Sequence, residues 1–522
     1  MVMHKISTIL MICLCSIISN AQNNYVKIFS DNYGILDICE NPDSTISISG
    51  IGFDTIYNSG QPSDEGIIGV QFAKVDWFGN LIYRRVYGSL RDEMAGHICR
   101  VEENGNVNYI MSGQTWSFSP PSPAPPSYSQ AYLVKVNSNG DTLWTRAVDY
   151  GGHVNYQDLT IATDSNYVYC GSNGAATLTK VNKTDGDTLW TRQYIQPISG
   201  SIGSTGLHLA PDSGFYMGGL VIPPAYNKSY FLLLKTDVVG MLQWCKAYGN
   251  NLKPMICWDM TVLSTQEVLL VGQTDVTLKS DFGVIKLNAL GDTLWCYKYN
   301  FLPDQYDVGV SVMEDTDGNY LILGYTNDNT GASKLLKIDT AGNVLWAWRY
   351  KWNGGPHLKI KKAYDGGFWI ASGVLVKLDS AGYGCTALAH PVSRKAFALN
   401  IETINLQMAG GAVACFRTPT IEFTDTASLT DYCIYLGQND FTFTNKSVHM
   451  HPNPASTQLT VQLPNANTGY VTVAIYDVIG NILQAPARKE ISNDSFTVDI
   501  NHLSTGMYFI KVNHWVLRFV KQ

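Results

Sequence analysis

The sequence has few charged residues, no C-x-x-C pair and none of the short motifs of common hydrolases or nucleotide-binding enzymes. Only 15% of its 522 residues are charged, against roughly 25% in typical soluble domains. Long amphipathic helices need charged outer faces, so few are expected. The missing C-x-x-C argues against zinc-ribbon and thioredoxin-like sites. No G-x-S-x-G, G-x-x-x-x-G-K or H-E-x-x-H occurs, which removes the usual signatures of serine hydrolases, P-loop enzymes and zinc proteases.

The sequence also lacks a basic patch and a long apolar run. Its net charge is −7 and no dense Lys/Arg segment occurs, so we expect no nucleic-acid partner. After the first residues, no stretch approaches eighteen uninterrupted apolar residues, and we expect no integral membrane segment. No ligand set for a metal or cofactor is visible either, and we expect neither.

The N-terminus has the pattern of an export signal. Lys5 precedes an apolar run from Ile6 to Ile18 that is too short to span a bilayer. Small residues then precede a cleavage site between Ala21 and Gln22. We interpret residues 1–21 as a signal peptide and expect the mature chain to be exported from the cytoplasm.

Two of the eleven cysteines fall in the signal segment, which leaves an odd number, nine, in the mature chain. Several lie in strand-like runs, where cysteine serves as a small core residue. A disulfide between Cys415 and Cys433 is the one candidate pairing, in an oxidising compartment.

A repeated phrase dominates residues 22–385. It consists of Lys, any residue, Asp or Asn, a short gap, Gly, and an apolar-aromatic strand ending near Tyr; the last copy is truncated. Its lysines are Lys74, Lys135, Lys180, Lys235, Lys286, Lys337 and Lys377. An Asx residue followed shortly by Gly suits a tight β-turn. An apolar run ending in Gly precedes each copy, as in Val268-Leu-Leu-Val-Gly272.

Each unit therefore predicts about four strands, and successive lysines lie 40 to 61 residues apart, as in propeller blades. The strand that should follow Lys377 is missing, and Tyr25-Val-Lys-Ile-Phe29 has the right character to replace it. We predict an all-β fold with a seven-bladed β-propeller closed by this N-terminal strand; six or eight blades are the alternatives.

The repeat resembles that of quinoprotein-like propellers, in which a Gly lies four residues before a Trp. The segment Lys180 to Trp190, with Gly186, is the most similar copy. The resemblance implies a fold, not a chemistry, because the vicinal cysteines of quinone dehydrogenases are absent.

Residues 448–522 form alternating strands split by Asn and Gly turns, which predicts a small antiparallel β-sandwich. Their motifs resemble the type A C-terminal sorting domain of the type IX secretion system of Bacteroidota. The matching residues are Pro452, Asn453, Pro454, Tyr476, Asp477, Gly480, Leu503, Gly506, Tyr508 and Lys521. The resemblance implies export by that machinery and removal of the domain by a sortase-like peptidase, so that the mature protein is secreted or attached to the outer-membrane surface.

Residues 386–447 contain strand-like runs without the propeller or the sorting motifs. They could form either a β-rich linker or a small module.

Catalytic candidates are few. Asp315-Thr-Asp317-Gly318 resembles the start of a calcium loop but lacks the later Glu, and a turn explains it better. Four histidines lie in the repeats without a shared motif: His97, His153, His208 and His357.

Two functions stay open. The first is a binding or interaction module for glycan or protein. The second is a polysaccharide hydrolase or lyase with carboxylates from several blades meeting at the axis. Paired acids within about 5–10 Å would favour the second.

Overall fold

The computed structural model describes most of the chain from residue 25 onward. The described ranges are 25–29, 34–54, 67–88, 93–117, 128–150, 155–196, 201–223, 228–275, 279–301, 306–326, 332–353, 358–384, 386–409, 414–417, 421–424, 429–434, 449–462, 468–476, 482–492, 495–512 and 515–522. The predicted signal peptide, residues 1–21, and its predicted cleavage site lie outside these ranges. The chain divides into two compact units, one of residues 23–433 and one that holds residues 434–522.

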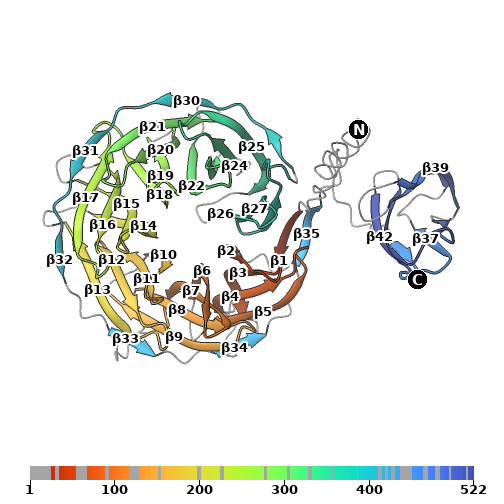
Figure 1. The fold of residues 1–522 in the computed structure, drawn as a ribbon, viewed down its shortest axis with the longest axis horizontal. Coiled ribbons are helices and arrows are strands. Elements are labelled where there is room, and N and C mark those ends of the chain that lie inside the picture. Colours follow the sequence, from red (N-terminus) through yellow and green to blue (C-terminus); the bar gives the residue numbers. More distant parts are fainter. Residues whose placement is uncertain are drawn as a thin grey trace, which may run out of the picture. The chain divides into compact units, whose positions relative to one another are not determined.

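The larger unit is a ring of seven five-stranded antiparallel sheets (Figure 1). Sheet 1 consists of β2 (Ile35–Glu40), β3 (Ile46–Asp54), β4 (Ile67–Val75), β5 (Leu81–Gly88) and β34 (Ile421–Thr424). Sheet 2 consists of β6 (Glu93–Glu103), β7 (Asn106–Thr115), β8 (Gln130–Asn137), β9 (Thr142–Asp149) and β33 (Ala414–Arg417). Sheet 3 consists of β10 (Asn155–Ile161), β11 (Tyr167–Ser172), β12 (Ala176–Val181), β13 (Thr188–Ile195) and β32 (Gln407–Ala409). Sheet 4 consists of β14 (Ile202–Leu209), β15 (Phe215–Val221), β16 (Tyr230–Thr236), β17 (Leu242–Gly249) and β31 (Asn400–Thr403).

The remaining sheets of the ring follow the same plan. Sheet 5 consists of β18 (Met255–Val262), β19 (Val268–Thr274), β20 (Asp281–Leu287), β21 (Thr293–Asn300) and β30 (Ser393–Ala396). Sheet 6 consists of β22 (Asp307–Glu314), β23 (Tyr320–Thr326), β24 (Ala332–Ile338), β25 (Val344–Asn353) and β29 (Leu388–Ala389). Sheet 7 consists of β26 (Lys359–Lys362), β27 (Phe368–Ala371), β28 (Leu375–Leu378), β1 (Tyr25–Phe29) and β35 (Leu429–Ile434).

Sheet 7 closes the ring with strands from distant parts of the chain. β1 pairs with β28, with Tyr25 opposite Lys377 and Lys27 opposite Leu375. This is the closure predicted from the missing strand after the seventh lysine, and the pairing confirms it. Each sheet also carries a fifth strand, which the sequence did not predict. All seven fifth strands come from residues 388–434, the segment whose role the sequence left open.

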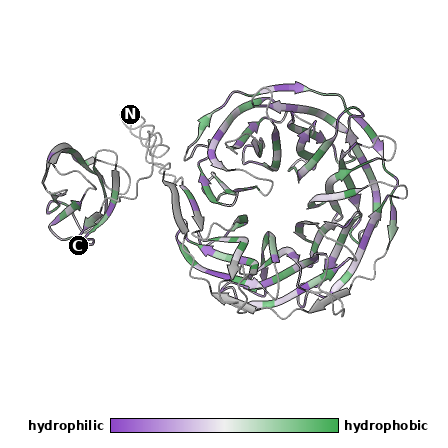
Figure 2. Cartoon of the chain, turned by 180° about the vertical axis from the view of Figure 1, so that it is seen from behind, coloured by the Kyte–Doolittle hydropathy of each residue, from purple (hydrophilic) through white to green (hydrophobic). Residues whose placement is uncertain are grey.

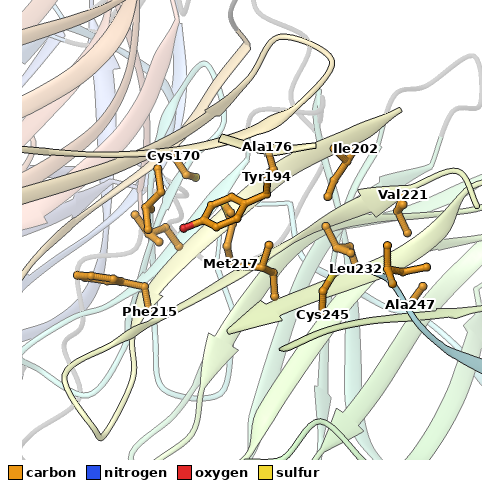
Figure 3. Packing of buried hydrophobic residues seen from close by; sticks show 14 of the residues in the cluster. Cys170, Ala176, Tyr194, Ile202, Phe215, Met217, Val221, Leu232, Cys245 and Ala247 are labelled. Atoms are coloured by element: carbon orange, nitrogen blue, oxygen red, sulfur yellow. The ribbon is translucent and has the colours of Figure 1, made fainter. Parts of the chain in front are cut away.

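Apolar side chains pack between neighbouring sheets and form the core of the ring. Between sheets 3 and 4, Tyr194, Met217 and Leu232 are fully buried in one cluster (Figure 3). Similar clusters fill the seams between other sheets. In Figure 2, hydrophobic segments recur in every sheet of the ring.

The repeated phrase forms contacts between neighbouring sheets. In sheet 4, Asp237 Oδ1 accepts hydrogen bonds from the backbone nitrogens of Val239 (3.0 Å) and Met241 (2.7 Å) and shapes the turn. Gly240 in this turn has φ +77°, which favours glycine. An added Cβ there would lie 2.9 Å from Trp190 of sheet 3. The repeat's Gly and Trp therefore belong to one contact, made by consecutive copies.

The lysine of each copy pairs with an acidic side chain near the turn between the first two strands of its own sheet. Lys235 Nζ lies 2.7 Å from Asp212 Oδ1, and the Lys235 side chain is only 5% exposed. The other pairs are Lys74–Asp43, Lys135–Glu103, Lys180–Asp164, Lys286–Glu267, Lys337–Asp315 and Lys377–Asp365. A buried lysine needs such a partner, which explains why the lysine recurs in every copy.

The smaller unit contains a seven-stranded antiparallel sheet. Its strands, in order across the sheet, are β36 (His449–His451), β37 (Gln458–Gln462), β40 (Ser495–Asp499), β39 (Ile482–Ser492), β38 (Thr468–Tyr476), β41 (Gly506–Val512) and β42 (Trp515–Lys521). Residues from near both ends of the sheet, Leu459 in β37 and Phe519 in β42, are fully buried in one cluster. The sheet therefore curls around a single core. No helix in the described ranges is long and apolar enough to cross a membrane.

Candidate functional site

The first strands of the sheets lie innermost in the ring (Figure 1), and three of them present an aspartate at the same position. In β2, β10 and β18 a bulge immediately precedes Asp37, Asp158 and Asp259. A β-bulge bends the strand and re-aims the following side chain. The three aspartates therefore occupy equivalent places in sheets 1, 3 and 5.

Each aspartate joins its own sheet to the next one. Asp37 Oδ1 accepts a hydrogen bond from the backbone nitrogen of Ile38 (2.9 Å), and Asp37 Oδ2 accepts one from the backbone nitrogen of Ile98 in β6 (3.2 Å). Asp158 Oδ2 accepts from Leu207 N in β14 (2.9 Å). Asp259 Oδ2 accepts from Val312 N in β22 (2.9 Å). Sheets 1 and 2, 3 and 4, and 5 and 6 are linked in this way near the axis.

Basic side chains complete this group. His97 Nδ1 in β6 lies 3.2 Å from Asp37 Oδ2 and 3.5 Å from Asp158 Oδ1. From β26, Lys361 Nζ lies 3.6 Å from Asp37 Oδ1 and Lys359 Nζ lies 3.2 Å from Asp259 Oδ1. We call these six residues (Asp37, His97, Asp158, Asp259, Lys359 and Lys361) the axial cluster.

The axial cluster stabilises the charged forms of two of its carboxyl groups, those of Asp37 and Asp158. Burial alone would raise the pKa of Asp37, but the charge of Lys361 and the hydrogen bond with His97 outweigh it and hold this pKa well below its usual range. For Asp158 the charges of His97 and Lys359 outweigh burial in the same way and lower its pKa. The pKa of Lys361 is raised, chiefly by Asp37. Both carboxylates and this lysine are therefore charged at neutral pH.

Access to the cluster is uneven. The Asp37 side chain is 2% exposed, whereas the Lys361 side chain is 45% exposed. His208, in β14, lies near the same acids, and burial lowers its pKa despite the charges of Asp158 and Asp259. Lys361 is therefore the member of the cluster most open to a molecule that enters along the axis.

The chemistry of this cluster differs from that of a paired-acid hydrolase. His97 Nδ1 contacts both Asp37 and Asp158. The distance between the two carboxyl groups is therefore below the roughly 10 Å that separates the two catalytic acids of glycoside hydrolases. A general acid must hold its proton, and its pKa is raised for that purpose. Here the pKa values of both groups are lowered. The arrangement can bind polar or charged groups, but it supplies no protonated acid from this pair.

Sequence reasoning missed the axial cluster, although a signal exists. Asp37, Asp158 and Asp259 each lie thirteen residues before the glycine that ends an apolar run, namely Gly50, Gly171 and Gly272. Of the four histidines considered, His97 and His208 come together at the axis, and His153 and His357 lie outside the described residues.

The turn near Asp315 forms as predicted. Asp315 Oδ1 accepts hydrogen bonds from the backbone nitrogens of Asp317 (2.8 Å) and Asn319 (3.0 Å), and its other oxygen contacts Lys337. Its carboxylate is therefore used inside the sheet. Across the described ranges, no group of three or more His, Cys, Asp or Glu side chains is arranged to hold a metal ion.

The Cys415–Cys433 disulfide is not favoured by the fold. Cys415 lies in β33 of sheet 2 and Cys433 in β35 of sheet 7, with sheet 1 between them in the ring (Figure 1).

In the smaller unit, motifs far apart in sequence meet at one end of the sheet. Asn453 Nδ2 donates to Arg518 O (3.1 Å), and Asn453 Oδ1 accepts from Val520 N (2.9 Å). Lys521 lies opposite Gly506 in the β41–β42 pair and forms a parallel bridge with Ala455. The Pro-Asn-Pro loop is thus fastened to the last strand.

The other motif residues serve this sheet as well. Leu503 is buried in its core, and the Tyr508 hydroxyl donates to Ser504 O at 2.8 Å. Tyr476 lies opposite Phe509 in the β38–β41 pair. Asp477 and Gly480 lie outside the described residues.

The comparisons with known proteins agree with this description of the smaller unit. Residues 449–521 match the family described as "Secretion system C-terminal sorting domain". This part of the chain is a type IX C-terminal sorting domain. The sorting domain marks its protein for export to the cell surface or the medium.

Solved structures similar to the chain include propellers. The Dos1 propeller is 9% identical, with 74% of this chain and 95% of that chain covered and a TM-score of 0.40. Quinohemoprotein alcohol dehydrogenase ADHIIG from Pseudomonas putida HK5 is 8% identical, with 69% and 68% covered and a TM-score of 0.36. A Bacteroides caccae protein of unknown function is 15% identical, with 54% and 90% covered and a TM-score of 0.35. Similarities of this size say nothing about ligand or chemistry. No curated protein matches the chain.

Proposed function

We propose that this chain is a secreted or surface-attached binding protein with a seven-bladed propeller that the type IX system exports. The seven five-stranded sheets support the count of seven blades. Residues 1–21 would be the signal peptide, and residues 448–522 the sorting domain, folded as a small sandwich and removed by a sortase-like peptidase. The ligand would be a glycan or another protein.

One observation carries the preference for binding over catalysis. Asp37 and Asp158 are close enough to act as a pair, yet the pKa of each is lowered and each accepts backbone hydrogen bonds from two sheets. Such carboxylates suit a fixed polar surface better than proton transfer. Lys361, the most exposed member of the cluster, would contact the ligand.

A polysaccharide hydrolase or lyase is the second candidate, and the closeness of the two carboxyl groups is the observation that favours it. In this case Asp37 or Asp158 would have to change its protonation when substrate binds.

A screen of glycans and polysaccharides, for both retention and cleavage, separates the two. The chain from residue 22 onward should retain at least one polymer without cutting it, and Lys361→Gln should weaken that retention. Arg394, exposed on the outside of the ring, offers a matched control, since Arg394→Gln removes a charge away from the axis. Recovery of cut oligosaccharides that disappear with Asp37→Asn would overturn the binding proposal.

A further inference from the structure

Residues 388–434, which we call the belt, contribute seven described strands, one on the outer edge of each sheet of the ring (Figure 1). Successive strands of the belt join the sheets in the reverse of the order in which the chain forms those sheets. The first belt strand joins sheet 6, the next five join sheets 5, 4, 3, 2 and 1, and the last joins sheet 7. Each strand pairs with the outermost repeat strand of its sheet, as β31 does with β17. Unpaired edge strands are open to association with other chains, and the belt covers part of all seven.

The belt advances by a constant step. Strands β30 to β34 begin at residues 393, 400, 407, 414 and 421, one every seven residues. A seven-residue extended segment spans at most about 23–25 Å. An apolar residue precedes four of these strands, namely Val392, Leu399, Leu406 and Val413. The sequence of the belt is thus matched to the repeat of the ring.

Where the side chains of the belt are described, residues at the seams between sheets hold it more than the faces of β30 and β31 do, and Met408 in β32 also packs against the core. All four side chains of β30 are exposed, and three of four in β31. In contrast, Leu399 packs against a cluster shared by sheets 4 and 5, and Leu406 against one shared by sheets 3 and 4. Val392 packs against the cluster shared by sheets 5 and 6. Each of these clusters combines residues of two neighbouring sheets, so it is complete only when both sheets are in place.

The last belt strand has a special neighbour. β35 pairs with β1, the N-terminal strand, which on its other side pairs with β28. Without β35, β1 would be the outer edge of sheet 7 and would be held on one side only. With β35, the closing strand becomes an interior strand with neighbours on both sides.

We propose that the belt is a clasp that holds the ring shut, because its seam residues need adjacent sheets and its last strand encloses the closing strand β1. In the sequence, β35 is the last strand before the sorting domain, whose first strand begins at His449. The belt can pair with all seven sheets only when the ring is closed. The strand that precedes the sorting domain in the sequence, β35, is therefore paired only after the ring has folded. This device is independent of what the propeller binds.

Hydrogen exchange of the full chain from residue 22 onward tests the clasp under mild denaturant. Amides of β1 and β35 should open together, at a lower denaturant concentration than those of β20, an interior strand of sheet 5. Exchange of β1 only upon global unfolding, or before β35, would overturn the proposal.

Proline substitutions sharpen the test. Asp431→Pro and Tyr432→Pro are made separately, because adjacent strand amides point to opposite sides. At least one should speed exchange in β1 by about tenfold or more, while β20 stays protected. Arg394→Pro and Lys395→Pro in β30, made separately for the same reason, are the matched controls; at least one should expose β21, and neither should affect β1. Unchanged β1 exchange in a variant whose β35 amides exchange freely would also contradict the clasp.

Discussion

The Tyr248 hydroxyl donates a hydrogen bond of 2.6 Å to the carbonyl oxygen of Gly291, in the turn of the neighbouring sheet. Four other copies repeat this contact between the Tyr of one sheet and the Gly of the next. They are Tyr87–Gly140, Tyr194–Gly240, Tyr299–Gly342 and Tyr350–Gly382. The Tyr and Gly of the repeat therefore recur along this chain because they hold one sheet to the next.

Removal of this hydroxyl measures the contact directly. Tyr248→Phe should lower the free energy of unfolding by about 1–2 kcal/mol, because a buried carbonyl loses its donor. Tyr364→Phe is the control, since Tyr364 is 69% exposed, and it should change stability little. Urea unfolding measures both. Equal effects in the two variants would show that the hydroxyl does not join the sheets.

The glycine of the turn is equally open to test. In Gly291→Ala the added Cβ would lie 2.8 Å from Trp244 and 2.9 Å from the Tyr248 hydroxyl, at φ +78°. We expect a loss of about 3 kcal/mol, from backbone strain and the collision together. Gly174→Ala shares the positive φ (+94°) but meets nothing within 4 Å, and should cost about 1–2 kcal/mol. If both variants lose the same stability, contact with the neighbouring sheet is not what the repeat requires.

The axial cluster predicts a particular dependence on pH. The folded-state pKa of Asp37 is depressed, so its contribution is present above the unfolded pKa of about 4 and is lost as the pH falls through the folded value. Asp37→Asn should destabilise the ring at pH 7 by about 2–4 kcal/mol, because Lys361 and the bound amides lose a charged partner.

The variant should also lose stability less steeply than the wild type below about pH 4. Asp76→Asn serves as control, since this aspartate lies in an exposed outer turn. If the free energy of unfolding changed with pH in parallel for the wild type and Asp37→Asn, the depressed pKa of Asp37 in the folded state would be contradicted.

The sorting domain allows a local test. Asn453→Ala removes both bonds that fasten the Pro-Asn-Pro loop to the last strand. The loop should detach and export should fall, with the full chain retained inside the cell. Gln458→Ala, an exposed change in the same sheet, should be exported normally. Immunoblots of medium, surface and cell fractions distinguish these outcomes.

Much of the fold could be predicted from sequence because the repeat is local. The turn Asx, the glycine and the Trp–Tyr strand lie within about fifteen residues in each copy, so the number of copies and the missing strand could be read directly. The sorting motifs could be recognised for the same reason, and Asn453, Gly506 and Lys521 indeed meet in one structure.

The belt and the axial cluster could not be recognised in this way. Belt strands are short, and β30 and β31 expose nearly all of their side chains, so the alternation that marks a strand is absent there, and the spacing of Val392, Leu399, Leu406 and Val413 remains as a signal. Asp37, Asp158 and Asp259 each look like an isolated acid, because their partners lie on other sheets. Their common spacing of thirteen residues from a repeat glycine does not by itself reveal the strand bulge that aims them.

The most direct test of the account is where the protein goes with and without its sorting domain. The full chain and a chain that ends at residue 448 would be expressed in a bacterium with an active type IX system. The full chain should reach the medium or the cell surface, and the truncated chain should fold but stay in the periplasm. Equal export of both, or export of the full chain in a strain without that system, would contradict the account.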